Sequence, residues 1–190
     1  MDILSAILSV VFVLIIILLV IVIYFFSTYN RLKNLRNAAD ATLSQARVAM
    51  KKRLDMIEQL VEAVKSYAKF EQDTFVKITS MRANVGKADT GELRKIEGES
   101  RGILGNIIAV AENYPALKTS DTVTSVMKSV KDIEDEIARH RYTYNNIIQE
   151  YNTMLDTIPS RFVGRSAGMS KKEYLDFFDE ELKRPVVSWS

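Results

Sequence analysis

The stretch ILSAILSVVFVLIIILLVIVIYFFSTYN, residues 3–30, contains no charged side chain and is continuously apolar from Val10 to Phe26. A helix needs roughly 20 mostly apolar residues to cross the hydrocarbon core of a bilayer. Apart from closed barrels, only a helix satisfies its own backbone polar groups in lipid. The sequence therefore predicts one membrane-spanning helix, with residues 1–30 as a transmembrane anchor.

A cleaved signal peptide is the alternative interpretation of this stretch. Such a peptide begins with basic residues, has an apolar core of about 7–15 residues and ends at a small-residue cleavage site. Here Asp2 is the only early charge, and the sequence from Tyr24 to Tyr29 has no small-x-small pattern. We therefore expect the anchor to be retained.

The charge beside the anchor predicts its orientation. Residues 31–53 carry seven Lys or Arg residues against Asp40 alone. Basic residues flank the cytoplasmic end of a span, so we expect a single-pass protein of the cell membrane with its N-terminus outside and its C-terminal domain in the cytoplasm. Each basic residue near anionic lipid contributes about 1 kcal/mol of attraction. The candidate lipid-facing basic residues are Arg31, Lys33, Arg36, Lys51, Lys52 and Arg53.

Residues 31–182 have the apolar spacing of helices and are predicted to form one helical bundle, followed by a tail over 183–190. Apolar positions recur at three and four over 32–85, 92–113 and 119–158, and no stretch alternates with period two. Ser170 and Glu173 have the spacing of a capping box, which predicts a short last helix. The predicted fold class is all-α: an N-terminal transmembrane helix, then an antiparallel three- or four-helix bundle with a long first helix.

The predicted helix over 32–85 has an apolar stripe that is longer than the predicted second helix over 92–113. Part of the stripe therefore has no obvious partner within the chain. One interpretation is that the chain bends near Ser44-Gln45 and buries the stripe in ordinary core. The other is that the stripe packs on copies of the chain, on another membrane protein or on the bilayer surface. The candidate interaction stripe consists of Leu32, Leu35, Leu43, Met50, Leu54, Ile57, Val61 and Val64.

Several polar residues fall in step with apolar ones and are candidate structural polar residues. Glu71 and Arg141 would be costly to bury without partners, so each should be paired or lie at the edge of a seam. Two Tyr-Asn pairs lie seven positions apart and hence on one helix face. They form either a recognition patch or, as the favoured interpretation, interior polar residues that fix helix register. These pairs are Tyr144, Asn145, Tyr151 and Asn152.

Catalytic residues are scarce in this chain. There is no cysteine, and the one histidine, His140, lies between two arginines on a polar helix face. No glycine-rich phosphate loop is present. A carboxylate metal site around 92–112 would lack the Glu-x-x-His pairs usual in helical bundles. We therefore expect no enzyme, no cofactor, no metal and no small-molecule substrate.

The chain resembles the LemA family of single-span membrane proteins from about Tyr29 to Phe178. The most specific block is Ala111 to Lys118, which helical periodicity alone would not generate. The resemblance implies an N-terminal span followed by a cytoplasmic antiparallel helical bundle, and it implies no established activity. The family often has a proline after the position of Ile57, where this chain has Glu58-Gln59, so a straighter first helix is implied. Other matching residues are Asn30, Leu32, Arg53, Asp55, Leu60, Glu62, Tyr67, Glu71, Arg82, Arg141, Tyr144, Tyr151, Pro159 and Phe177.

The function expected from these features is binding. The leading hypothesis is a membrane-anchored scaffold or regulatory subunit of a membrane complex, either a homo-oligomer or a partner of another membrane protein. The alternative is a membrane-surface organiser that uses the basic juxtamembrane segment on anionic lipid. A tether at the membrane makes lipid a nearer partner than nucleic acid, and no nucleic-acid partner is expected.

Overall fold

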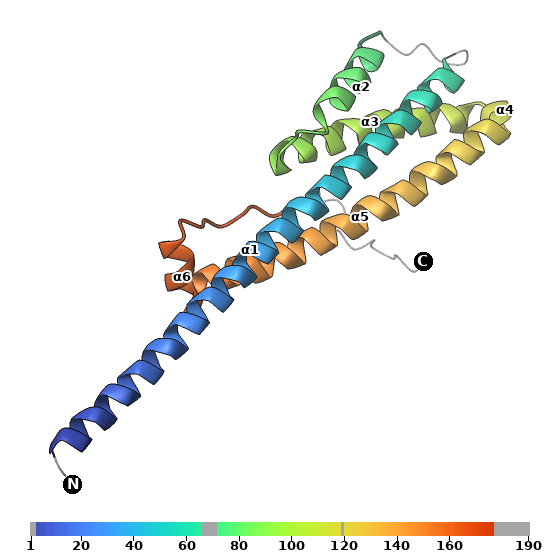
Figure 1. Cartoon of the computed structure of the whole chain (residues 1–190). Coiled ribbons are helices and arrows are strands. Elements are labelled where there is room, and N and C mark those ends of the chain that lie inside the picture. Colours follow the sequence, from blue (N-terminus) through green and yellow to red (C-terminus); the bar gives the residue numbers. More distant parts are fainter. Residues whose placement is uncertain (1–2, 66–71, 119, 177–190) are drawn as a thin grey trace, which may run out of the picture. The chain divides into compact units, whose positions relative to one another are not determined.

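The computed structural model describes residues 3–65, 72–118 and 120–176, and every regular element in these ranges is a helix (Figure 1). The expected all-α class is confirmed. The helices are α1 (Ile3–Val64), α2 (Gln72–Asn84), α3 (Thr90–Asn113), α4 (Pro115–Lys118), α5 (Asp121–Asp156) and α6 (Ser160–Ser166). The chain divides into two compact units: residues 1–39 with 146–172, and residues 40–145 with 173–190.

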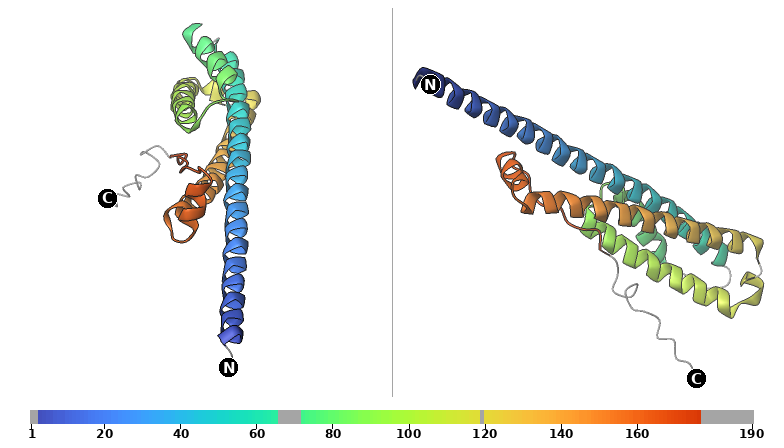
Figure 2. Two further views of the ribbon diagram at one scale, coloured as in Figure 1. Left: turned by 60° about the vertical axis from the view of Figure 1, so that its left-hand side comes forward. Right: turned by 90° about the horizontal axis from the view of Figure 1, so that it is seen from below.

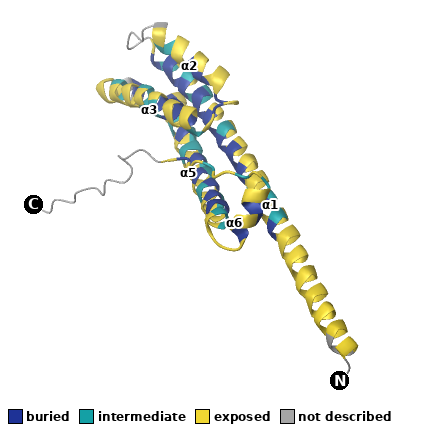
Figure 3. Ribbon diagram, turned by 90° about the vertical axis from the view of Figure 1, so that its left-hand side faces the viewer, coloured by how far each residue is buried: buried dark blue, intermediate teal, exposed yellow. Residues whose placement is uncertain are grey.

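In the first unit, α1 begins with the uncharged segment. Its side chains from Ile3 to Phe26 are exposed wherever they are described, as Figure 3 shows for this end of the helix. Within the part of the chain that the structure describes, α1 alone is long and apolar enough to cross a membrane. Burial begins at Thr28 and Leu32, where the end of α5 and helix α6 pack against α1.

In the second unit, α2 packs back along α1. Arg82 of α2 forms ion pairs with Asp55, at 2.7 Å, and with Glu58, at 3.3 Å, both on α1. α2 therefore runs back along α1, with its C-terminal end beside Asp55 and Glu58. The bend near Ser44-Gln45, one of the two interpretations of the stripe, is absent, because α1 is helical throughout this stretch. In Figure 2, α2 and α3 lie beside this part of α1.

The ends of α3 follow local sequence signals. Asp89 caps the helix: its carboxylate accepts the backbone N–H of Glu92 at 2.8 Å, and the Glu92 carboxylate accepts the N–H of Asp89 at 3.3 Å. At the other end Tyr114 has extended geometry, with φ −123° and ψ 94°. The residue before a proline avoids helical geometry, so Pro115 ends α3 as expected.

The region after Pro159 differs from the sequence-based expectation. The helix lies at Ser160–Ser166, where a loop was expected, and residues 169–176 contain no helix, although one was expected to begin at Ser170. Gly168 has φ +62°, a conformation that glycine adopts without strain, and it separates the two segments. The remainder of the expected last helix lies outside the described residues.

Candidate functional site

Arg53 is the most deeply buried of the described charged residues in the second unit, with 0% of its surface exposed. Its guanidinium donates to the Glu134 carboxylate at 2.8 Å, to the Ser100 hydroxyl and to the backbone carbonyl of Glu97 at 3.4 Å. The expectation that Arg53 faces lipid is therefore wrong. Arg53 is in helical step with Met50 and Ile57, so it points into the bundle and needs internal acceptors.

A second buried ion pair joins α5 to α3. Arg141 and Glu97 are each only 2% exposed, and Arg141 donates to a Glu97 carboxylate oxygen at 2.6 Å. The same oxygen accepts from Arg101 at 3.2 Å. Arg141 also donates to the backbone carbonyl of Asp176 at 2.8 Å. Glu97 thus provides the counter-charge for two arginines.

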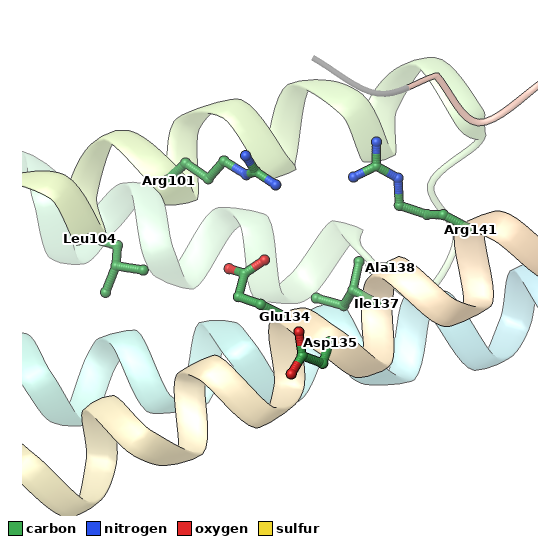
Figure 4. Close-up of a pocket in the computed structure, with 7 residues that line it drawn as sticks. All are labelled: Arg101, Leu104, Glu134, Asp135, Ile137, Ala138 and Arg141. Atoms are coloured by element: carbon green, nitrogen blue, oxygen red, sulfur yellow. The ribbon is translucent and has the colours of Figure 1, made fainter. Parts of the chain in front are cut away.

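Arg101 and Arg141 line a cavity of about 390 Å³ between α3 and α5. In Figure 4 the guanidinium groups of Arg101 and Arg141 face each other across it, and the side chain of Glu134 lies below them. The charged residues that line the cavity are two arginines, Arg101 and Arg141, and two carboxylates, Glu134 and Asp135, so the charges of its lining balance. Among the described residues, no group of three or more His, Asp or Glu residues could hold a metal ion.

The two Tyr-Asn pairs of α5 bind the extended C-terminal segment. In the second unit, the Asn145 side chain accepts the N–H of Leu175 at 2.8 Å and donates to its carbonyl at 3.0 Å. Tyr144 donates to the carbonyl of Glu173 at 3.0 Å. Each asparagine amide forms hydrogen bonds with both the N–H and the carbonyl of one backbone residue, as a residue of a neighbouring β-strand would. Burial and the carboxylates of Asp40 and Glu173 raise the pKa of Tyr144 above its ordinary value against the opposing effect of Arg47, so its hydroxyl remains a donor to higher pH than that of a free tyrosine.

The same pattern occurs in the first unit. Asn152 accepts the N–H of Lys172 at 3.0 Å and donates to its carbonyl at 2.9 Å. Tyr151 donates to the carbonyl of Ser170 at 3.2 Å. The sequence indicated that these side chains share a face, but it gave no sign that the face binds this chain's own backbone.

Replacing Asn152 with leucine, which is similar in size, is expected to release this segment locally. The backbone N–H and carbonyl of Lys172 would lose their partners at a cost of about 1–3 kcal/mol. Amide hydrogen exchange in a peptide covering 170–176 should then accelerate roughly 5- to 150-fold. Asn37→Leu, at an exposed position of α1, is the matched control. Unchanged exchange in Asn152→Leu would contradict a role for Asn152 in holding the segment.

Most of the candidate stripe on α1 is buried within the chain. Only Leu35 is partly exposed. The expected second helix, 92–113, is too short to cover the whole stripe. The longer helix α5, with 36 residues, covers the remainder. The stripe is thus not an open surface of this chain. The buried members are Leu32, Leu43, Met50, Leu54, Ile57, Val61 and Val64.

The remaining candidate basic residues have different surroundings. Arg31 pairs with Glu150 at 2.6 Å and Lys52 with Glu136 at 3.4 Å, on exposed faces. The ammonium of Lys33 lies 5.7 Å from the ring centre of Tyr29. Arg36 and Lys51 are exposed. Glu71 lies outside the described residues.

Comparison with known proteins identifies the family of this bundle. Residues 42–189 match the LemA family, which covers most of the chain. The chain belongs to the LemA family. The matched range includes the buried arginine network of the second unit and both Tyr-Asn pairs.

Curated relatives are similar over much of the chain. The magnetosome protein MamQ of Magnetospirillum gryphiswaldense is 24% identical over 173 residues, covering 77% of this chain and 64% of MamQ. Magnetosome protein MamQ 2 of Paramagnetospirillum magneticum is 25% identical over the same length. Protein LemA of Metamycoplasma hominis is 27% identical over 130 residues, covering 67% of this chain and 59% of the relative. The chain therefore spans less than two thirds of the length of these relatives.

Proposed function

We propose that this protein is a membrane-anchored scaffold or regulatory subunit of a membrane complex, acting by binding and without catalysis of its own. One observation carries the proposal: a single helix, α1, joins an exposed, uncharged apolar segment to a folded helical bundle. A water-exposed apolar surface of this length would be strongly unfavourable, and a bilayer is the environment it fits. The bundle is thereby held next to other membrane proteins.

The interior of the bundle supports binding over chemistry. Its buried charges are matched in ion pairs that join helices, which is what a rigid support needs. The relatives named as magnetosome proteins fit a role at a membrane-bounded structure. The seven basic residues over 31–53 favour an N-terminus outside and a cytoplasmic bundle.

The alternative, a membrane-surface organiser acting through the juxtamembrane segment, has weaker support. Of the six candidate lipid-facing basic residues, Arg53 is buried, and Arg31 and Lys52 are paired with carboxylates. Each pairing reduces the positive charge available to lipid. Among the residues that the structure describes, Lys33, Arg36 and Lys51 have no carboxylate partner within ion-pair distance, and three charges are too few for strong electrostatic attachment at about 1 kcal/mol each.

The test is the mass and composition of the full-length protein extracted in mild detergent from its own membrane at native abundance. Light scattering gives the stoichiometry and mass spectrometry the contents. The expected result is a stable complex, either with a foreign subunit or with further copies of the chain. A homogeneous monomer would overturn the scaffold.

A control variant shows which part of the chain binds. Ile57→Asp places a charge in the bundle core and should unfold the bundle while leaving the apolar segment of α1 intact. Loss of the complex in this variant assigns binding to the bundle. A complex that survives would instead place the contact in the membrane-spanning segment.

A further inference from the structure

An apolar groove of about 490 Å³ lies in the first unit between α1 and the corner that joins α5 to α6. One wall is the uncharged part of α1, including Ile21 and Phe25. The other wall includes Pro159, Phe162 and Val163. The groove therefore has the proposed membrane-spanning segment itself as one side, and whatever surrounds that segment also enters the groove.

The α6 wall has the composition of a membrane-interface element. Ile158 is 73% exposed and Phe162 is 61% exposed. Arg161 and Arg165 are exposed beside them, and the sequence from Ser160 to Ser166 contains no acidic residue. Apolar side chains flanked by basic ones enter the boundary between headgroups and acyl chains of anionic membranes.

The placement of α6 is set by packing within the same unit. The Ser160 hydroxyl donates to the carbonyl of Met154 at 2.7 Å, which ties the start of α6 to the end of α5. Gly164 lies against Leu155 so closely that a Cβ atom would press into that side chain. Because α6 is fixed in this way, Phe162 and the groove are formed before any ligand arrives, as is usual for binding sites.

We infer that this groove binds one acyl chain of a membrane phospholipid, with Arg161 and Arg165 at its anionic headgroup. The occupant follows from continuity and charge: one wall of the groove belongs to an uncharged helix, and the exposed Arg161 and Arg165 are the sequence neighbours of its lining residues Phe162 and Ser166. This inference rests on the proposed membrane anchoring, and it adds a second attachment point that would hold the first unit at the bilayer surface. It also places the lipid contact on α6, away from the basic segment over 31–53.

Quenching of tryptophan fluorescence by brominated lipid tests the inference on the full chain. The chain has one tryptophan, so a Trp189→Phe background gives a silent protein. Three variants then carry one tryptophan each: Phe162→Trp in the groove, Tyr24→Trp in the span, and Tyr142→Trp, 65% exposed on α5 of the second unit. Each is reconstituted in phosphatidylcholine and phosphatidylglycerol with bromine atoms near the top of the acyl chains.

Phe162→Trp should lose at least half as much emission as Tyr24→Trp, because an interfacial element lies about 5–10 Å deep, within reach of the bromine atoms. Tyr142→Trp gives the background. Quenching of Tyr24→Trp without quenching of Phe162→Trp above this background would overturn the lipid groove and leave the anchor standing. An unquenched Tyr24→Trp would overturn the anchor and the groove together.

A charge-reversed variant tests the headgroup contact. With bromine on phosphatidylglycerol only, Arg161→Glu with Arg165→Glu should lower the quenching of Phe162→Trp to the level seen with bromine on phosphatidylcholine only. Arg139→Glu, at an exposed position of α5, is the matched control and should change nothing. Equal quenching in the double variant and the control would overturn the assignment of these arginines to the headgroup.

Discussion

Replacing Glu97 with glutamine is expected to lower the free energy of unfolding by about 3–5 kcal/mol, the usual cost of breaking a buried ion pair from one side. Glutamine keeps the size of the side chain and removes its charge. Arg141, 2% exposed, would then retain its positive charge without the carboxylate that receives it at 2.6 Å. Thermal unfolding of the full-length protein in detergent, followed by circular dichroism, should show Tm lower by about 6–20 °C.

Two further variants separate the ion pair from general effects of substitution. Glu99→Gln makes the same change at an exposed position of α3 and should leave Tm nearly unchanged. Glu97→Leu combined with Arg141→Met removes both charges and should recover most of the loss, since apolar replacement of a complete buried pair is often neutral. A single variant as stable as the parent would show that Glu97 does not balance Arg141.

Local sequence signals predicted much of the fold. The uncharged stretch 3–30 indicated the anchor, and spacing at three and four indicated the helices. The predicted range 92–113 lies within α3 (Thr90–Asn113). These signals act within a few residues of the chain, so one sequence is enough to recognise them.

The sequence did not predict the arginine network because Arg53 belongs to two patterns at once. It ends a basic run, and it also lies on the apolar face of its helix. Arg53 follows Lys51 and Lys52 and was grouped with them as lipid-facing, yet it shares a face with Met50 and Ile57. Glu97 similarly falls in step with Leu93 and Ser100, which are both buried. A basic and an acidic residue that each lie on an apolar stripe are a detectable sign of an internal pair. Which arginine would pair with which carboxylate depends on helix packing and could not be read from spacing.

The C-terminal segment shows a tertiary contact overriding a local signal. Ser170 and Glu173 have capping-box spacing, which favours a helix by satisfying two backbone donors. In the structure, Asn145 and Asn152 instead satisfy both backbone groups of Leu175 and of Lys172. These contacts come from residues 20 to 30 positions away, and no local rule anticipates them.

Replacing Ile57 with alanine is expected to cost about 2–5 kcal/mol of unfolding free energy. Ile57 is 0% exposed on the face of α1 that was a candidate interaction stripe. In the structure its contacts are internal, so truncation leaves a cavity in the bundle. The same thermal unfolding measurement on the full-length protein should show the loss without any change in protein concentration dependence, because the cavity forms within one chain.

Val48→Ala removes apolar atoms from the same helix at a position that is 54% exposed, and it should change stability by no more than about 0.5 kcal/mol. If Ile57→Ala instead kept its Tm and lost the native complex, the stripe would be an intermolecular surface after all. The comparison matters for any search for partners. Aspartate substitutions at Leu54, Ile57 or Val61 would unfold the bundle, so loss of a complex in those variants assigns binding to the bundle but cannot locate an interface within it. Substitutions at exposed positions of α1 and α5 can.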